Sequence, residues 1–428
     1  MTQPFRIALA GLGTVGTGVL RMLDTHGPQI AERAGRPIEV VAVSARSRSR
    51  DRGVDISRHA WADDPVTLAT RDGIDCLVEV MGGEDGPAKA AVEAALDAGR
   101  HVVTANKAML ARHGTGMAAR AEANGAALRF EAAVAGGIPV VKALGEGLVG
   151  NAITRVLGVM NGTCNYILTE MARSGADYAD VLAEAQRLGY AEADPEADVG
   201  GFDAAHKLAL LAAIAFGTEV DFDGVEIDGI HRITLADIRQ AADMGYRIKL
   251  LGVARMNADG LEQRMQPCLV PAASALGQLD GVTNAVAIEG DFIGQIALEG
   301  PGAGAGPTAS AILGDLVDIA RGVNRPALGR AAHALRRAER SQTGSEAAYY
   351  LRLALRDAPG TLARVATCLG EGEISIDMMR QYGHRGSDAP VVIVTHPTSR
   401  AALTAALRAI QRLDVCSDEP VALRIEPE

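Results

Sequence analysis

The feature that most constrains the fold is a glycine pattern close to the N-terminus. It has the spacing G-x-G-x-x-G and comprises Gly11, Leu12, Gly13, Thr14, Val15 and Gly16. An apolar run at 6–10 precedes it and a helical run at 17–23 follows, as a dinucleotide-binding turn requires. The first glycine allows a tight turn, the second admits pyrophosphate to the backbone, and the third lets helix and strand pack closely. A tight turn without a ligand is the weaker alternative because further strand–helix units follow.

Those further units predict the fold class. Apolar strands are expected at 38–44, 75–81, 100–104 and 127–133, and helices at 87–98 and 110–124. Alternating strands and helices indicate an α/β fold with a doubly wound, mostly parallel sheet of the Rossmann type. A second glycine-rich loop at 300–307, which includes Gly306, precedes a helix expected at 308–321. We assign 1–137 to this domain and expect 305–330 to complete it.

The loop after the second strand indicates which nucleotide is bound. A carboxylate there would bind the ribose 2′-hydroxyl of NAD. The chain instead reads Ser44-Ala45-Arg46, and an arginine at this point suits a 2′-phosphate. NADP(H) is therefore favoured, while NAD(H) stays open, as does the alternative of a solvated basic loop. The fourth strand ends at Thr104, followed by Lys107, and strand ends of this kind face the ligand crevice. An exposed loop lysine is the alternative for Lys107.

An acidic stretch lies in the middle of the chain, at 190–207. Its carboxylates are Glu192, Asp194, Glu196, Asp198 and Asp203. Pro195 and the glycines at 200–201 are expected to prevent any helix before Phe202. Asp203 and Lys207 are four residues apart on the strong helix former that follows, so they share one face. A solvated salt bridge would explain the pair, but a lysine on so apolar a helix needs a reason.

The remaining chain divides into two further parts. Residues 138–304 are expected to form an α+β substrate and dimerisation domain, with short strands and helices alternating over 220–270. Residues 331–347 are polar and charged and predict a linker. Residues 348–428 predict βαββαβ, a ferredoxin-like module.

Composition excludes several classes of protein. The formal charge of −11 argues against general binding to nucleic acid or to anionic membranes. The longest apolar run, 208–216, is too short to span a bilayer. The five cysteines have no zinc or disulfide spacing, which suits a reducing cytosol, so we expect a cytoplasmic protein.

Four motifs together resemble homoserine dehydrogenase: the glycine pattern at 11–16, Thr104-Ala-Asn-Lys107, Asn161-Gly-Thr-Cys-Asn165, and Ala193-Asp-Pro-x-x-Asp-x-x-Gly-x-Asp203-x-x-x-Lys207. The resemblance covers about 5–330, and the tail resembles an ACT domain. It implies NAD(P)H-dependent reduction of aspartate 4-semialdehyde to L-homoserine, a step in threonine, methionine and isoleucine biosynthesis. The alternatives are another Rossmann-fold amino-acid dehydrogenase and an inactive nucleotide sensor.

The resemblance also implies roles for individual residues. Lys207 is the proton donor, Lys107 is a second cation near the reacting oxygen, and Asp203 orients Lys207 or the substrate. Glu192 and Asp198 join Asp203 and Lys107 in binding substrate, while Thr104, Lys107, Arg46 and Gly306 join the glycine loop at the cofactor. His206 is expected to be structural, since it points away from the Asp203–Lys207 face.

Two further expectations follow from the resemblance. A structural sodium ion would be held by Glu131 and by the carbonyls of Val134, Gly136 and Ile138; a glycine hinge is the alternative. The tail would bind an amino-acid effector, with L-threonine the first candidate, near the loop from Asp357 to Gly360. Tails of this kind pair, so we expect a homo-oligomer, either a dimer or a tetramer.

Overall fold

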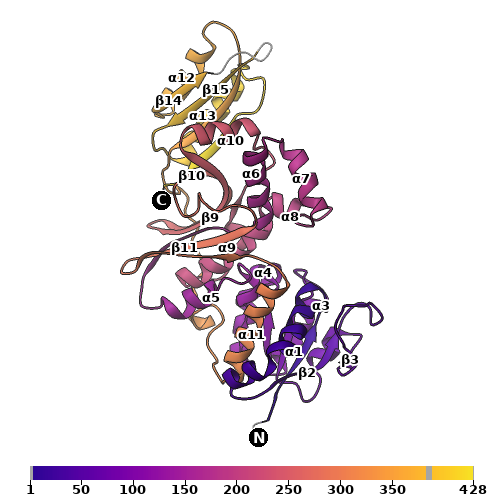
Figure 1. Ribbon diagram of the computed structural model, residues 1–428. Coiled ribbons are helices and arrows are strands. Elements are labelled where there is room, and N and C mark those ends of the chain that lie inside the picture. The colour runs from indigo at the N-terminus through magenta and orange to yellow at the C-terminus, as the bar shows by residue number, and fades with distance from the viewer. Residues whose placement is uncertain (1–2, 382–387, 428) are drawn as a thin grey trace.

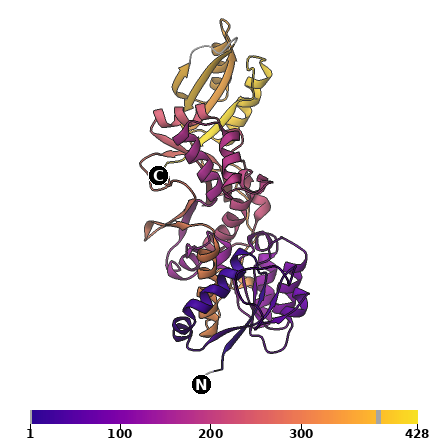
Figure 2. The ribbon, with the colours of Figure 1, turned by 45° about the vertical axis from the view of Figure 1, so that its right-hand side comes forward.

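A computed structural model describes residues 3–381 and 388–427. The molecule is elongated, with the N-terminal part at one end and the C-terminal tail at the other (Figures 1 and 2). The middle part joins them. The molecule therefore has two junctions, one between the N-terminal part and the middle part, and one between the middle part and the tail.

The first sheet has six strands in the order β3-β2-β1-β4-β5-β6, all paired in parallel. Its strands are β1 (Phe5–Ala10), β2 (Ile38–Ser44), β3 (Ala60–Trp61), β4 (Cys76–Glu79), β5 (His101–Thr104) and β6 (Leu128–Arg129). This order confirms the predicted Rossmann-type sheet. The inner strands β1 and β4 are mostly apolar and buried because helices cover both faces.

The helices of this part are α1 (Thr14–Ala34), α2 (Pro65–Ala69), α3 (Pro87–Asp97), α4 (Lys107–Ala123) and, from much later in the chain, α11 (Ala305–Ala320). Helix α11 lies against α1 (Figure 1). The approach is so close that a Cβ on Gly18 would lie 2.7 Å from the carbonyl oxygen of Ala305. The second glycine-rich loop therefore brings the chain back beside the nucleotide loop.

The second sheet has ten strands, and part of its prediction was wrong. The strands that the middle part of the chain contributes are β7 (Ile153–Val159), β8 (Glu226–Ile227), β9 (Tyr246–Asn257), β10 (Gly260–Pro271), β11 (Thr283–Gly290) and β12 (Gly294–Pro301). Short alternating elements were expected over 220–270, but β9 and β10 form one long antiparallel hairpin. The period-2 signal was hidden because most of β9 is buried on both faces.

Helices cover this middle sheet. They are α5 (Val140–Lys142), α6 (Gly162–Ser174), α7 (Tyr178–Arg187), α8 (Glu196–Val199), α9 (Phe202–Phe216) and α10 (Leu235–Asp243). Short turns of 3₁₀ or π helix occur at Glu131–Ala133, Ala143–Gly147, Phe222–Gly224 and Ala332–Ala334. Two expectations were wrong here: the strand predicted at 127–133 ends at Arg129, and a one-turn helix, α8, forms before Phe202. Pro195 permits α8 because it immediately precedes it, outside the helix interior.

The tail has the predicted βαββαβ order: β13 (Tyr349–Arg356), α12 (Thr361–Glu371), β14 (Ile376–Gln381), β15 (Asp388–Thr395), α13 (Arg400–Arg412) and β16 (Val421–Ile425). Its sheet order is β16-β13-β15-β14. Strand β16 also pairs with β10, in parallel, at Cys268–Arg424 and Leu269–Ile425. The tail thus continues the middle sheet, which the sequence did not predict.

None of the described helices is both long enough and apolar enough to cross a bilayer.

Candidate active site

Helix α9 carries the first part of the site. Gly201 precedes it with φ +87°, a left-handed conformation that favours glycine. Asp203 therefore lies in the first turn, where a carboxylate suits the helix dipole. Lys207 follows one turn later and is only 7% exposed. The pair is buried, so the alternative of a solvated surface salt bridge does not hold.

The Asp203 carboxylate joins two ammonium groups. Lys207 Nζ lies 2.6 Å from Oδ2, and Lys107 Nζ lies 2.9 Å from Oδ1. Lys107 is the first residue of α4, directly beyond the carboxyl end of β5, and its side chain is 36% exposed. Two lysines from different helices, α4 and α9, therefore converge on one carboxylate, at the junction between the nucleotide-binding part and the middle part.

Asn161 holds the acidic side of this cluster in place. Its Nδ2 donates to Asp198 Oδ1 at 2.7 Å and to Asp203 Oδ2 at 3.2 Å, while its Oδ1 accepts from the Cys164 N–H as the cap of α6. Lys207 Nζ also donates to the Met160 carbonyl at 2.7 Å. By sequence, Asn161 was only one member of the motif at 161–165, with no role of its own. Its position before a helix was the available signal, because asparagine is a preferred N-cap.

The charges of the cluster stabilise one another. Burial alone would raise the pKa of Asp203, but Lys207 and Lys107 outweigh burial and hold that pKa below its usual range. Asp203 in turn raises the pKa of Lys107, against the effect of burial. Burial raises the pKa of Asp198, and the hydrogen bond from Asn161 opposes this. Asp203 is therefore ionised and Lys107 charged across the neutral range.

Glu192 lies apart from these contacts, on the exposed loop between α7 and α8. Its backbone carbonyl accepts from Gln186 Nε2 at 2.9 Å. Its carboxylate nevertheless contributes to the raised pKa of Lys107. Glu192 therefore acts on Lys107 through its charge, from an exposed position outside the hydrogen-bonded cluster.

His206 packs beside the cluster, with its ring 4.4 Å from the ring of Phe222. Burial lowers its pKa. The structural role expected for His206 stays a prediction.

The glycine loop has the geometry that each glycine was expected to provide. Gly11 has φ +106°, and a Cβ on it would lie 2.6 Å from the Val80 carbonyl oxygen. A Cβ on Gly16 would lie 2.0 Å from the Gly11 carbonyl oxygen. A Cβ on Gly13 would meet nothing within 4 Å, as would one on Gly306. Gly11 and Gly16 are required by packing, while Gly13 leaves open space where a pyrophosphate would lie.

The other predicted cofactor residues fall into two groups. Arg46 is exposed beyond the end of β2, beside the glycine loop. Thr104 is buried, and its Oγ1 donates to Glu79 Oε2 at 2.6 Å while accepting from the Asn106 N–H at 3.0 Å. Thr104 thus fixes the start of α4. Arg52, which the sequence analysis missed, donates to the Leu12 carbonyl at 3.2 Å and braces the glycine loop.

The loop predicted to hold sodium surrounds two buried carboxyl groups. Glu131 accepts from the N–H groups of Val141 and Lys142, both at 2.9 Å, and its own N–H donates to Asp315. Burial raises the pKa of Glu131 to about 7 and that of Asp315 to about 6. Within 3–381 and 388–427 no group of three His, Cys, Asp or Glu side chains is placed to hold a metal. The predicted sodium ligands are of a different type from such a group, because they comprise one carboxylate and three backbone carbonyls.

Comparisons with known proteins agree along the whole chain. Family models match at 11–131 (homoserine dehydrogenase, NAD binding domain), 139–317 (homoserine dehydrogenase) and 349–415 (ACT domain). The homoserine dehydrogenases of Neisseria gonorrhoeae and Mycobacterium tuberculosis are 42% and 41% identical, with at least 98% of each chain covered. The crystal structure of a homoserine dehydrogenase from Thiobacillus denitrificans has a TM-score of 0.94, 41% identity and 99% coverage of both chains.

Proposed function

The chain belongs to the homoserine dehydrogenase family, and from this premise we propose how its residues divide the work of the reaction. The reaction reduces L-aspartate 4-semialdehyde to L-homoserine. NAD(P)H supplies the hydride, which arrives at the aldehyde carbon. Negative charge grows on the aldehyde oxygen, so the protein must stabilise that charge and deliver a proton. Another dehydrogenase and an inactive sensor are not favoured, because the matches span all parts of the chain.

One observation carries the assignment of roles: Asp203 holds both Lys107 and Lys207. An ammonium group has three donors. Lys207 uses one on Asp203 and one on the Met160 carbonyl, so its third donor is available to the substrate oxygen. Lys207 is the proton donor. Lys107 is the second cation beside the same oxygen, and Asp203 fixes the two relative to each other.

The substrate is a zwitterion whose ammonium group needs an acidic partner. Glu192, which is exposed, and Asp198, which is half-buried, supply two carboxylates whose charges both act on Lys107. Asn161 holds Asp198 at 2.7 Å. We assign Glu192 and Asp198 to the substrate ammonium, with Asp203 and Lys107 completing the substrate site.

The glycine loop and the N-terminus of α1 would hold the pyrophosphate of the cofactor, and Gly306, next to the Ala305 that lies against α1, would line the same site. Arg46, exposed beyond the end of β2, is assigned to a 2′-phosphate, and we therefore propose NADP(H) over NAD(H). Thr104 acts through the position of Lys107, because its hydroxyl is bound to Glu79.

We keep a structural sodium ion at the loop 131–138 as a proposal, with Glu131 and the carbonyls of Val134, Gly136 and Ile138 as ligands; of these, the Ile138 carbonyl also accepts from the Val140 N–H at 2.8 Å. Within the described chain, no N–H or side chain donates to the carbonyls of Val134 or Gly136. A cation there would offset the burial of Glu131 and Asp315. Hard oxygen ligands suit a hard cation.

The tail, residues 348–428, carries an ACT domain and is assigned to regulation by an amino acid, with L-threonine the first candidate. We place the domain boundaries at 137, 304, 330 and 347. The protein works as a homo-oligomer, a dimer or a tetramer, and in the cytoplasm, where its five free cysteines stay reduced.

A substrate panel tests the function. NADPH oxidation is followed with L-aspartate 4-semialdehyde, with succinic semialdehyde and with a 2-oxo acid. We expect rapid turnover of L-aspartate 4-semialdehyde. We expect kcat/KM to be at least tenfold lower for succinic semialdehyde, because it lacks the ammonium group. Equal turnover of both aldehydes would contradict the roles of Glu192 and Asp198.

A further inference from the structure

A buried carboxylate with no part in the proposed chemistry lies beside the glycine loop. Glu79 is the last residue of β4 and is 0% exposed. It is aligned with Ala10 of β1 on one side and with Thr104 of β5 on the other. The strand order reverses between β1 and β4, and the carboxyl ends of the strands at such a point form the ligand crevice. Glu79 therefore lies at the edge of this crevice, where a negative charge beside an anionic cofactor needs a reason.

The Glu79 carboxylate accepts hydrogen bonds from two segments. Its Oε1 accepts from the N–H groups of Met81 at 2.7 Å and Gly82 at 3.2 Å, which folds the loop after β4 back onto the strand. Gly82 and Gly83 permit this fold, because both have left-handed φ values, +81° and +92°. Its Oε2 accepts from the Thr104 hydroxyl at 2.6 Å. One carboxylate thus joins the loop after β4 to the end of β5.

The same two segments fix the residue before Lys107. Asn106 is 5% exposed, and its N–H donates to the Thr104 hydroxyl oxygen at 3.0 Å. Its Nδ2 donates to the Gly83 carbonyl at 2.7 Å, and its Oδ1 accepts from the Met109 N–H as the cap of α4. Lys107 is the next residue and the first of that helix. The backbone that carries Lys107 is therefore held by three contacts, of which the first two depend on the buried carboxylate.

The far end of the Lys107 side chain is bound by the middle part, where its Nζ lies 2.9 Å from Asp203 Oδ1. The loop after β4 meanwhile packs on the glycine loop, since a Cβ on Gly11 would lie 2.6 Å from the Val80 carbonyl oxygen. Glu79 thus connects the glycine loop with the start of α4. This position matters for turnover, because a displacement of about 1 Å at a reacting group can cost about 100-fold in rate.

We propose that Glu79 is a positioning residue that acts on turnover through Lys107, by holding the start of α4 against the loop after β4. The proposal rests on the role proposed for Lys107 and extends the site to a residue that touches neither the substrate nor the reacting atoms. A buried carboxylate that served stability alone would have no preferred partner in catalysis. The two roles therefore differ in whether the effects of Glu79 and Lys107 on kcat are independent.

A double-mutant cycle tests this coupling with Glu79→Gln, Lys107→Met and the two combined. We measure kcat at saturating NADPH and L-aspartate 4-semialdehyde, and NADPH affinity separately by fluorescence titration. Glutamine keeps an oxygen for the loop N–H groups, but its amide nitrogen cannot accept from the Thr104 hydroxyl. We expect Glu79→Gln to lower kcat at least tenfold while NADPH affinity stays within threefold. In the Lys107→Met background the same substitution should change kcat by less than twofold.

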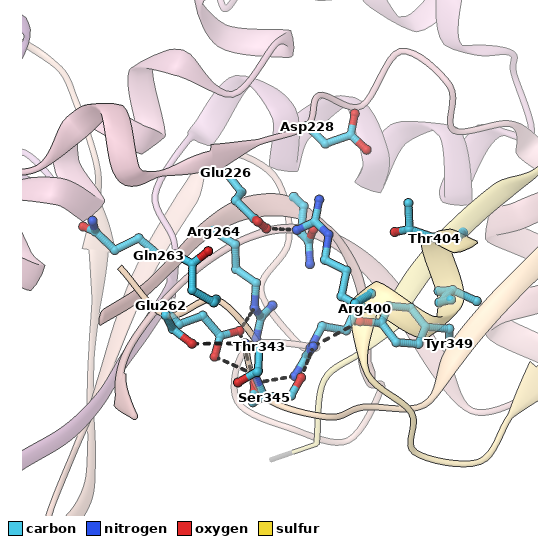
Figure 3. A pocket seen from close by; sticks show the side chains of 18 of the residues that line it. Glu226, Asp228, Glu262, Gln263, Arg264, Thr343, Ser345, Tyr349, Arg400 and Thr404 are labelled. Atoms are coloured by element: carbon cyan, nitrogen blue, oxygen red, sulfur yellow. Dashed lines mark hydrogen bonds and ion pairs between the residues drawn. The ribbon is translucent and has the colours of Figure 1, made fainter. Parts of the chain in front are cut away.

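Glu262→Gln is the matched control, because Glu262 is another carboxylate with few exposed atoms. It lines the pocket between the tail and the middle part, where it accepts from the Ser345 N–H at 3.0 Å and from the Ser345 hydroxyl at 3.1 Å (Figure 3). Its side chain is 10% exposed, and none of the proposed active-site residues lines that pocket. Glu262→Gln should therefore lower the melting temperature while kcat stays within twofold of its parent in both backgrounds.

Thr104→Val is a second variant of the same link and keeps the test decisive if Glu79→Gln does not fold. It removes the hydroxyl that joins Glu79 to the Asn106 N–H, so it should lower kcat in the wild type and leave it unchanged in the Lys107→Met background. Loss of kcat by the same factor in both backgrounds would overturn the proposal, as would a Glu79→Gln kcat within twofold of the wild type. A Lys107→Met protein with the wild-type kcat would instead contradict the role proposed for Lys107, and this inference with it.

Discussion

Replacing Glu426 by glutamine should separate the tail from the sheet that it extends. Glu426 is 4% exposed, and its carboxylate meets one arginine from each of three strands. Arg264 of β10 lies 2.7 Å away, Arg424 of β16 lies 3.1 Å away, and Arg155 of β7 lies 3.4 Å away. These arginines are themselves at most 5% exposed. The cluster lies beside the short β10–β16 pairing, so it holds the two domains in register.

The expected loss follows from burial. Removing one partner of a buried ion pair costs about 3–5 kcal/mol, because the remaining charges stay out of water. Glutamine keeps the shape and one carbonyl acceptor, while Glu262 and Glu289 still pair with Arg264 and Arg155. We therefore expect the low end, about 3 kcal/mol. That is a large fraction of the roughly 5–15 kcal/mol that stabilises a protein.

The assay is thermal and urea unfolding, followed by proteolysis to locate the part that opens first. Glu419→Gln is the matched control, because Glu419 is in the same domain but 66% exposed and pairs with Arg232 at 3.5 Å. The control should cost at most about 1 kcal/mol. Equal effects of the two substitutions would refute the argument that burial makes this cluster important.

Three further predictions concern the active site and the cofactor. Reduction should keep its rate between about pH 5 and 10, because the pKa of Asp203 is held below its unfolded value near 3.9 and that of Lys107 above its unfolded value near 10.4. Homoserine oxidation should speed up in alkali, where a lysine can accept the proton. Identical pH profiles in both directions would contradict this. Arg46→Ala should weaken NADPH binding at least tenfold more than NADH binding, measured by fluorescence titration, and equal losses would assign Arg46 a structural role. Gly13→Ala should fold normally but bind cofactor poorly, since its Cβ enters the open space assigned to the pyrophosphate. Gly16→Ala should lower the melting temperature, because its Cβ would lie 2.0 Å from a carbonyl oxygen. The reverse pattern would contradict the roles given to these glycines.

Much of this architecture is encoded locally. Strand β2 has the bounds that the sequence predicted, because its apolar run marks them. Asp203 and Lys207 were paired from their spacing alone. Lys107 was selected because the strand before it ends at the ligand crevice.

The features that were missed depend on contacts between distant residues. No local signal specifies that Cys268 pairs with Arg424, 156 positions later. The three arginines around Glu426 belong to separate strands, so their burial could not be read from the chain. Asn161 is an ordinary helix cap by sequence, and its second role exists only because α8 and α9 bring Asp198 and Asp203 to it.

The most direct test of the account is the turnover of L-aspartate 4-semialdehyde by Lys207→Met. Methionine keeps a long, unbranched side chain but cannot donate a proton or carry charge. With NADPH binding preserved, kcat should fall at least 100-fold, the lower range for loss of a general acid. A variant that binds NADPH normally and retains kcat within threefold of the wild type would contradict the assignment of Lys207 as the proton donor.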